Sequence, residues 1–166
     1  MPYSRLFYHV VWSTKGRHPW LTTERATLVE RMIRHKLHED ELKTILHAIA
    51  VMPDHVHVAM SVLPDQRLAW VIQQMKGSSS FLLQREDPSA DDEGFAWQGE
   101  YAVLSFSERN LPTVVDYIVN QEARHAENRL NAGLEPFRDG FKDPGVSRPM
   151  RSASPLPVDL SRLPRR

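Results

Sequence analysis

Hydrophobic positions in the first 130 residues switch between a period of two and a period of about 3.6, which predicts strands and helices in turn. Apolar residues between Thr22 and Glu39 fall on one helical stripe behind a threonine cap. Pro53 and Asp54 form a turn signal between two apolar runs and so predict an antiparallel hairpin. The predicted elements are a strand at Leu6–Ser13, a helix at Thr22–Glu39, strands at Thr44–Met52 and His55–Leu63, a helix capped by Asp65, a strand at Tyr101–Ser107 and a helix from Asn110 to about Leu130.

This order of elements, β-α-β-β-α-β-α, contains the split βαβ arrangement. It predicts an α+β, ferredoxin-like (RRM-like) fold, in which helices cover one face of an antiparallel sheet and the other face is open. One extra helix follows at the C-terminal end. The acidic residues from Glu86 to Glu93 surround Pro88 and Ser89, which predicts a solvated loop there.

The chain changes character near residue 130. Six of its twelve prolines follow Leu130, and the helical periodicity stops there. Residues 1–130 carry a net charge of −3 and residues 131–166 a net charge of +3, although the whole chain is neutral. We therefore predict one domain over 1–130 and a Pro-rich basic tail over 131–166 that is extended or disordered.

Composition limits the chemistry. The chain has no cysteine, which excludes disulfides, thiolate zinc sites and cysteine nucleophiles, whereas its eight histidines leave imidazole chemistry open. Basic and acidic residues number 21 each, so a charged partner has to be bound by a local patch. The sequence shows neither a secretory signal nor the roughly 18 apolar residues of a spanning helix. We expect a soluble cytoplasmic protein with no membrane partner.

Two pairs of residues could carry chemistry. His55 and His57 point to the same face of a strand, opposite the valines, at a separation that suits two ligands of one metal ion. Tyr117 and Gln121 are four residues apart and share one face of the last helix. Each pattern also fits a bland alternative, namely strand histidines that meet water or backbone, and a packing aromatic beside a surface glutamine.

Polar and basic residues form two candidate phosphate contacts. Residues 76–80, Lys-Gly-Ser-Ser-Ser, combine a cation, a flexible backbone position and hydroxyl groups, which commonly contact phosphates. A polar helix end would have the same composition. The loop after the first strand offers further cations. The candidates are Lys15, Arg17, Lys76, Ser78 and Ser79.

Four ordered motifs carry a resemblance to a known family. They are MPDHVHV on a strand, QQMKGSSS in a helix, WQGEY before a strand and YIVNQ on the last helix. Together with the opening FYHVVWSTKGRHPWLT, they resemble the single-tyrosine HUH transposases of the smallest bacterial insertion sequences and the related REP-associated tyrosine transposases. The likeness covers residues 3 to about 125 and leaves the tail out.

The resemblance implies a function. His55, His57 and Gln121 match the ligands of a Mg²⁺ or Mn²⁺ ion, and Tyr117 matches the nucleophile. Such an enzyme cuts and rejoins single-stranded DNA beside a hairpin through a 5′-phosphotyrosine. The resemblance also implies a homodimer. We expect Leu6–Ser13 to be an exposed edge strand that can join the sheet of a second copy.

Two other functions stay open. A non-catalytic RRM-like module would bind nucleic acid on the same fold, but its sheet should carry aromatic-rich strands where this chain has HVHVAMSV. A zinc hydrolase could use the two strand histidines, but no third histidine or carboxylate lies at a familiar zinc spacing.

Overall fold

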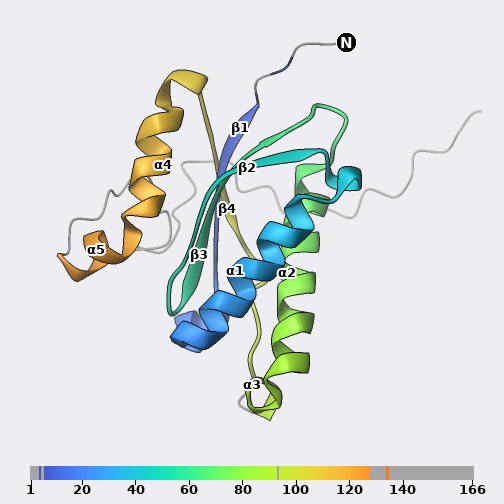
Figure 1. Cartoon of the computed structure of the whole chain (residues 1–166), viewed down its shortest axis with the longest axis vertical. Coiled ribbons are helices and arrows are strands. Elements are labelled where there is room, and N and C mark those ends of the chain that lie inside the picture. The colour runs from blue at the N-terminus through green and yellow to red at the C-terminus, as the bar shows by residue number, and fades with distance from the viewer. Residues whose placement is uncertain (1–3, 5, 93, 128–133, 135–166) are drawn as a thin grey trace, which may run out of the picture.

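Four antiparallel strands form one sheet in the order β2-β3-β1-β4 (Figure 1). In this computed structural model the described residues are 4, 6–92, 94–127 and 134. The hairpin of β2 and β3 turns at Pro53 and Asp54, as predicted. The strands are β1 (Phe7–Ser13), β2 (Thr44–Val51), β3 (His55–Val62) and β4 (Ala102–Phe106).

Helices α1 (Thr23–Leu37) and α2 (Leu68–Glu86) pack on one face of this sheet. Thr22 caps α1, because its hydroxyl accepts a hydrogen bond from the backbone N–H of Arg25. The alternate residues of β3 complete this core. They are Val56, Val58, Met60 and Val62, all buried.

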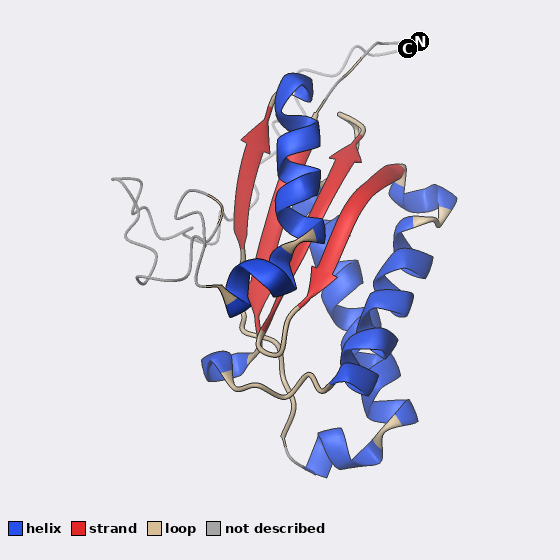
Figure 2. Cartoon of the chain, turned by 60° about the vertical axis from the view of Figure 1, so that its left-hand side comes forward, coloured by secondary structure: helices blue, strands red, loops and turns tan. Residues whose placement is uncertain are grey.

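The opposite face of the sheet is partly covered by α4 (Leu111–Val119), which lies across β2 and β3 (Figure 2). Val114, Tyr117 and Ile118 of α4 pack there against small residues of the strands. The ferredoxin-like order is therefore confirmed, but the expectation of an open second face is wrong. The physical reason is that the extra helix has an apolar side of its own to bury.

The predicted last helix is broken. It ends at Val119, and a second helix, α5, runs over Gln121–Ala126. Asn120 stands at the break, and its side-chain amide hydrogen-bonds back to the carbonyl and carboxylate of Asp116. Such local bonds compete with the regular helix. The predicted stretch from residue 128 to 130 lies outside the described residues, as does the predicted tail apart from Leu134, which packs against the α4 cluster.

Three local predictions are wrong. The first strand is not an edge, because β1 pairs with both β3 and β4 and leaves β2 and β4 as the edges. The acidic loop contains a short helix, α3 (Pro88–Asp92), which begins at a proline and buries Ala90. Asp65 does not cap α2, which begins after Arg67; its carboxylate pairs with Lys43 instead.

Within the described part of the chain, no helix is long and apolar enough to cross a membrane.

Candidate metal and tyrosine site

Strand β3 brings His55 and His57 to the face of the sheet beneath α4 and α5. The alternation of side chains along the strand puts both imidazoles there, as predicted, with ring centroids 4.9 Å apart. The two rings are fully enclosed, at 1% and 0% exposure. Buried imidazoles need hydrogen-bond partners, so their contacts define what each nitrogen can do.

His55 is held by a carboxylate. Its Nδ1 lies 2.6 Å from Oδ1 of Asp54, and Arg17 pairs with the other oxygen at 2.8 Å. Burial raises the pKa of Asp54, but hydrogen bonds and charge from His55 and Arg17 outweigh it and lower the pKa to about 2. The ionised carboxylate can only accept, so Nδ1 of His55 donates and the lone pair lies on Nε2.

His57 contacts the start of α5. Its Nε2 lies 3.2 Å from the amide nitrogen of Gln121, which also lies 3.0 Å from Nε2 of His125. Gln121 itself is fully buried. His125 is half-buried, and its ring centroid stands 5.1 Å from that of His55. His125 is not among the site residues predicted from the sequence; its position one turn after Gln121 on α5 was the available signal.

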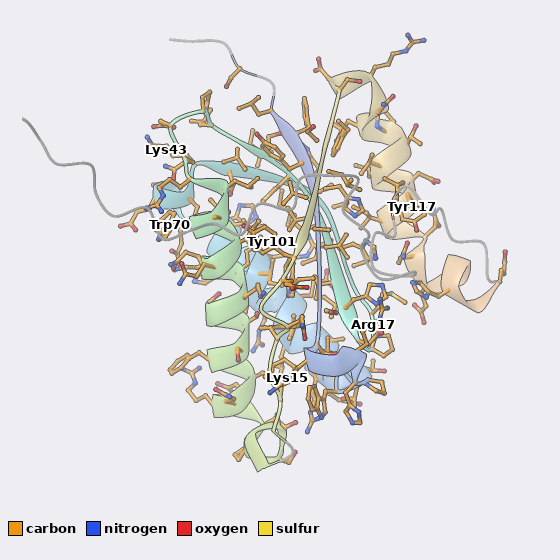
Figure 3. The ribbon with its side chains drawn as sticks, turned by 180° about the vertical axis from the view of Figure 1, so that it is seen from behind. Lys15, Arg17, Lys43, Trp70, Tyr101 and Tyr117 are labelled. Carbon is orange, nitrogen blue, oxygen red and sulfur yellow. The ribbon has the colours of Figure 1, made fainter. Side chains whose placement is uncertain are left out.

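Tyr117 lies on α4 (Figure 3), and its ring is a neighbour of the His57 ring. Its ring centroid lies 6.3 Å from that of His57, and the residue is 3% exposed. The break at Asn120 separates Tyr117 and Gln121 into two helices, yet both contact His57. Tyr117 thus lies beside His57, one of the two strand histidines.

These residues fit a divalent metal ion. Nε2 of His55 is buried and has no hydrogen-bond partner among the described residues, as a nitrogen reserved for a ligand would be. No three His, Cys, Asp or Glu side chains of the described residues form a metal-binding group, so a third protein ligand has to be of another type, such as an amide. Gln121 is the amide at this position. The same finding gives no support to the zinc hydrolase alternative.

The candidate DNA-binding residues divide into two groups. Lys15 and Arg17 lie in a 3₁₀ turn (Lys15–Arg17) at the His55 end of the sheet, and both are exposed (Figure 3). Lys76, Ser78 and Ser79 lie in the middle of α2, which packs on the other face.

The α2 group is held by protein contacts. Nζ of Lys76 donates to the carbonyl of Gln98 at 2.6 Å, and burial lowers the pKa of this amine. Ser78 is half-buried and donates to the carbonyl of Gln74. Ser79 is fully buried, donates to Met75 and accepts from Trp97.

A further histidine escaped the sequence reasoning. His9 on β1 is fully buried and contacts His57. The signals were the alternation of β1, which puts His9 on the face opposite Val10 and Trp12, and the predicted ferredoxin-like fold, in which the first strand lies beside the third.

Comparison with known proteins decides the family. A family model described as "Transposase IS200 like" matches residues 2–121, which includes both strand histidines, Tyr117 and Gln121. The chain belongs to the IS200-like transposase family. The resemblance to single-tyrosine transposases is therefore confirmed.

Individual relatives agree with this assignment. The transposase is 30% identical over 120 residues to the ISDra2 transposase TnpA of Deinococcus radiodurans, a match over 70% of this chain and 84% of the relative. A crystal structure assigned as a transposase of Deinococcus radiodurans R1 has a TM-score of 0.59 and 29% identity, over 73% of this chain and 95% of that one.

A REP-associated tyrosine transposase bound to a REP hairpin has the same fold, with a TM-score of 0.56 at 15% identity. The match covers 75% of this chain and 74% of that chain.

Proposed function

We propose that this transposase cuts and rejoins single-stranded DNA at hairpin-marked ends, with Tyr117 as the nucleophile and His55, His57 and Gln121 as ligands of Mg²⁺ or Mn²⁺. The observation that carries the proposal is the meeting of Tyr117 and Gln121 at His57, from two helices on one side of the sheet. Membership of a transposase family supports DNA as the substrate.

The chemical step is an exchange of phosphodiester bonds. The phenol oxygen of Tyr117 attacks a DNA phosphorus, its proton departs, and the bond from phosphorus to the 3′ oxygen breaks as that oxygen takes up a proton. The products are a 5′-phosphotyrosine and a free 3′-OH. Attack by a 3′-OH on the phosphotyrosine reverses the step and joins strands, so no nucleotide cofactor is needed.

A phenol with an ordinary pKa of about 10 is a weak nucleophile at neutral pH. A divalent cation at this site would polarise the scissile phosphate and stabilise the charge that develops on the leaving oxygen. The chain's own contribution is to hold the donor atoms. Asp54 orients His55 and keeps the lone pair on its Nε2, and Gln121, which lies beside His57, would supply its amide oxygen as the third donor.

Substrate binding in this proposal uses Lys15 and Arg17 next to the histidines, with Lys76 and Ser78 as a separate contact on α2. The predicted contact of Ser79 with DNA is wrong, because this side chain is fully buried. Arg17 would then bind DNA and hold Asp54, which couples substrate binding to the orientation of His55. We further propose a homodimer joined through an edge strand, β2 or β4, since these edges have backbone groups without a strand neighbour on one side in the described sheet.

Covalent capture of DNA tests the proposal. The full chain is incubated with Mg²⁺ or Mn²⁺ and single-stranded DNA from the flanks of its gene that folds into a hairpin, and the products are separated on a denaturing gel. We expect a cleaved strand with a free 3′-OH and a protein–DNA adduct. Tyr117→Phe should bind the hairpin yet yield neither product.

The matched control is Tyr101→Phe, because Tyr101 is another tyrosine of the same domain and lies beside Lys76 rather than the histidines. It should cleave like the wild type. A Tyr117→Phe protein that nicks DNA at the wild-type rate would rule out the covalent mechanism. Hairpin binding without any cleavage by the wild type would instead favour the non-catalytic RRM-like module.

A further inference from the structure

Two buried histidines on neighbouring strands form a hydrogen bond. Nε2 of His9 on β1 lies 2.9 Å from Nδ1 of His57 on β3. The rings are nearly parallel, with an interplanar angle of 18° and centroids 5.1 Å apart, and both residues are 0% exposed. The strand register makes them diagonal neighbours, because His57 pairs with Val11 and His9 with Ala59.

A second polar contact of His57, with Gln121, locates the protons in this pair. The amide nitrogen of Gln121 can only donate, so Nε2 of His57 at 3.2 Å accepts. A neutral imidazole carries one N–H, which is then on Nδ1 of His57. That N–H donates to His9, and Nε2 of His9 is therefore the acceptor of the bond.

The reverse arrangement would disable the site. If His9 carried its proton on Nε2 and donated it to His57, the proton of His57 would move to Nε2. A protonated Nε2 has no lone pair for a metal ion. The two arrangements have the same net charge and differ only in where the protons are.

We propose that His9 is a positioning residue that accepts the Nδ1 proton of His57 and so keeps Nε2 of His57 available as a metal ligand. This inference rests on the proposed function, which makes His57 a ligand. His9 does for His57 what Asp54 does for His55, with one difference: the partner of His55 is an anion that can only accept, whereas His9 is an imidazole that can hold its proton on either nitrogen.

A spectroscopic measurement on the metal-free full chain tests the proton positions directly. Long-range proton–nitrogen NMR spectra of ¹⁵N-histidine-labelled protein distinguish a protonated from an unprotonated ring nitrogen. We expect a protonated Nδ1 and an unprotonated Nε2 for His57, assigned by loss of its signals in His57→Ala. A protonated Nε2 on His57 would overturn the inference, whatever the enzyme does.

Variants of His9 then test the consequence for metal binding. Calorimetric titration with Mn²⁺ alone should show affinity about 10- to 100-fold weaker for His9→Leu, which has no acceptor. His9→Gln retains an amide oxygen that can accept the Nδ1 proton, and it should recover most of the affinity. His47→Leu is the matched control, since His47 lies on the same face of β2 and contacts Ser61 and Phe7.

The outcomes separate this inference from the proposed function. Unchanged Mn²⁺ affinity in His9→Leu overturns the positioning role, and so does equal loss in His9→Leu and His9→Gln, because packing alone would then explain both. If the wild type shows the expected protons but Mn²⁺ leaves the His55 and His57 signals unchanged, the metal site fails while the placement of the proton by His9 stands. If His9→Leu does not fold, the wild-type spectrum and His9→Gln still decide.

Discussion

On one face of the sheet β3 buries Val56, Val58 and Met60 beneath α1 and α2, and on the other it buries His55 and His57 beneath α4 and α5. The same eight-residue strand serves both faces. The aliphatic face is stabilised by contact area, which any apolar group of the right volume can supply. The histidine face depends on particular donors and acceptors, because a buried polar group is costly without its partner.

This difference has a functional consequence. Substitutions on the aliphatic face should change stability and leave the chemistry of the folded protein intact. Substitutions on the histidine face should change cleavage more than stability. The four predictions below test this separation, from the largest expected effect to the smallest.

His57→Ala should lower the rate of DNA cleavage by about 10³-fold, equivalent to about 4 kcal/mol of activation free energy, because it removes a ligand of the proposed metal ion. The rate is measured with hairpin DNA and Mg²⁺, and excess Mn²⁺ should restore part of it. His47→Ala, the same substitution on β2, should cleave normally. If the His57→Ala enzyme cleaves at the wild-type rate, His57 has no role in the cleavage reaction.

Met60→Ala should destabilise the fold by about 2–5 kcal/mol, since Met60 is fully buried in the aliphatic core and its loss leaves a cavity. Urea unfolding measures this free energy. The neighbouring change Ser61→Ala points to the other face and should cost about 1 kcal/mol, the value of its hydrogen bond to His47. Cleavage per folded Met60→Ala molecule should match the wild type; a strong loss would show that the faces are coupled.

Gln121→Ala should slow cleavage by about tenfold, or about 1.4 kcal/mol, in the same gel assay. A neutral amide is the weakest of the proposed ligands, and water can replace it. Gln121→Glu is the informative companion, because a carboxylate keeps the oxygen donor and should bind Mn²⁺ at least as tightly. A loss of cleavage rate in Gln121→Ala as large as that in His57→Ala would mean that Gln121 does more than supply one ligand.

Asp87→Asn should lower the free energy of unfolding by an amount that depends on pH, because Asp87 holds Arg25 of α1 on the aliphatic side of the sheet. Hydrogen bonds from Ser89 and then from buried Arg25 hold the pKa of Asp87 below its usual value. A lowered carboxyl pKa stabilises the fold above the ordinary pKa of about 4, and this stability is lost as the pH falls through the lowered value. Urea unfolding of both proteins should show a difference at pH 7 that shrinks below pH 4. A difference independent of pH would contradict this.

Local pattern was enough to predict much of the site. The facing of His55 and His57 follows from the alternation of a strand, and the turn before them follows from Pro53 and Asp54. The cap of α1 by Thr22 is equally local. Each of these depends only on residues within a few positions of each other, so no knowledge of the rest of the fold was needed.

Other features depend on side-chain contacts that the hydrophobic periodicity does not show. The break at Asn120 interrupts a sequence whose helical periodicity continues, and its side-chain bonds to Asp116 compete with that helix. The short helix α3 lies where a loop was expected. It is held there because Ala90 is buried in the core and because Asp87 and Ser89 bind Arg25 of α1. Neither outcome can be read from composition around the segment itself.

By itself, the sequence determined the four strands and the two long helices, the two faces of β3, the order of a ferredoxin-like fold and the motifs of an IS200-like transposase. Only the tertiary structure decided that His9 meets His57 and that His125 stands beside His55. The physical reason is that periodicity and turns arise from neighbours along the chain, whereas the contacts of buried histidines arise from packing between β1, β3 and α5, segments separated by tens of residues.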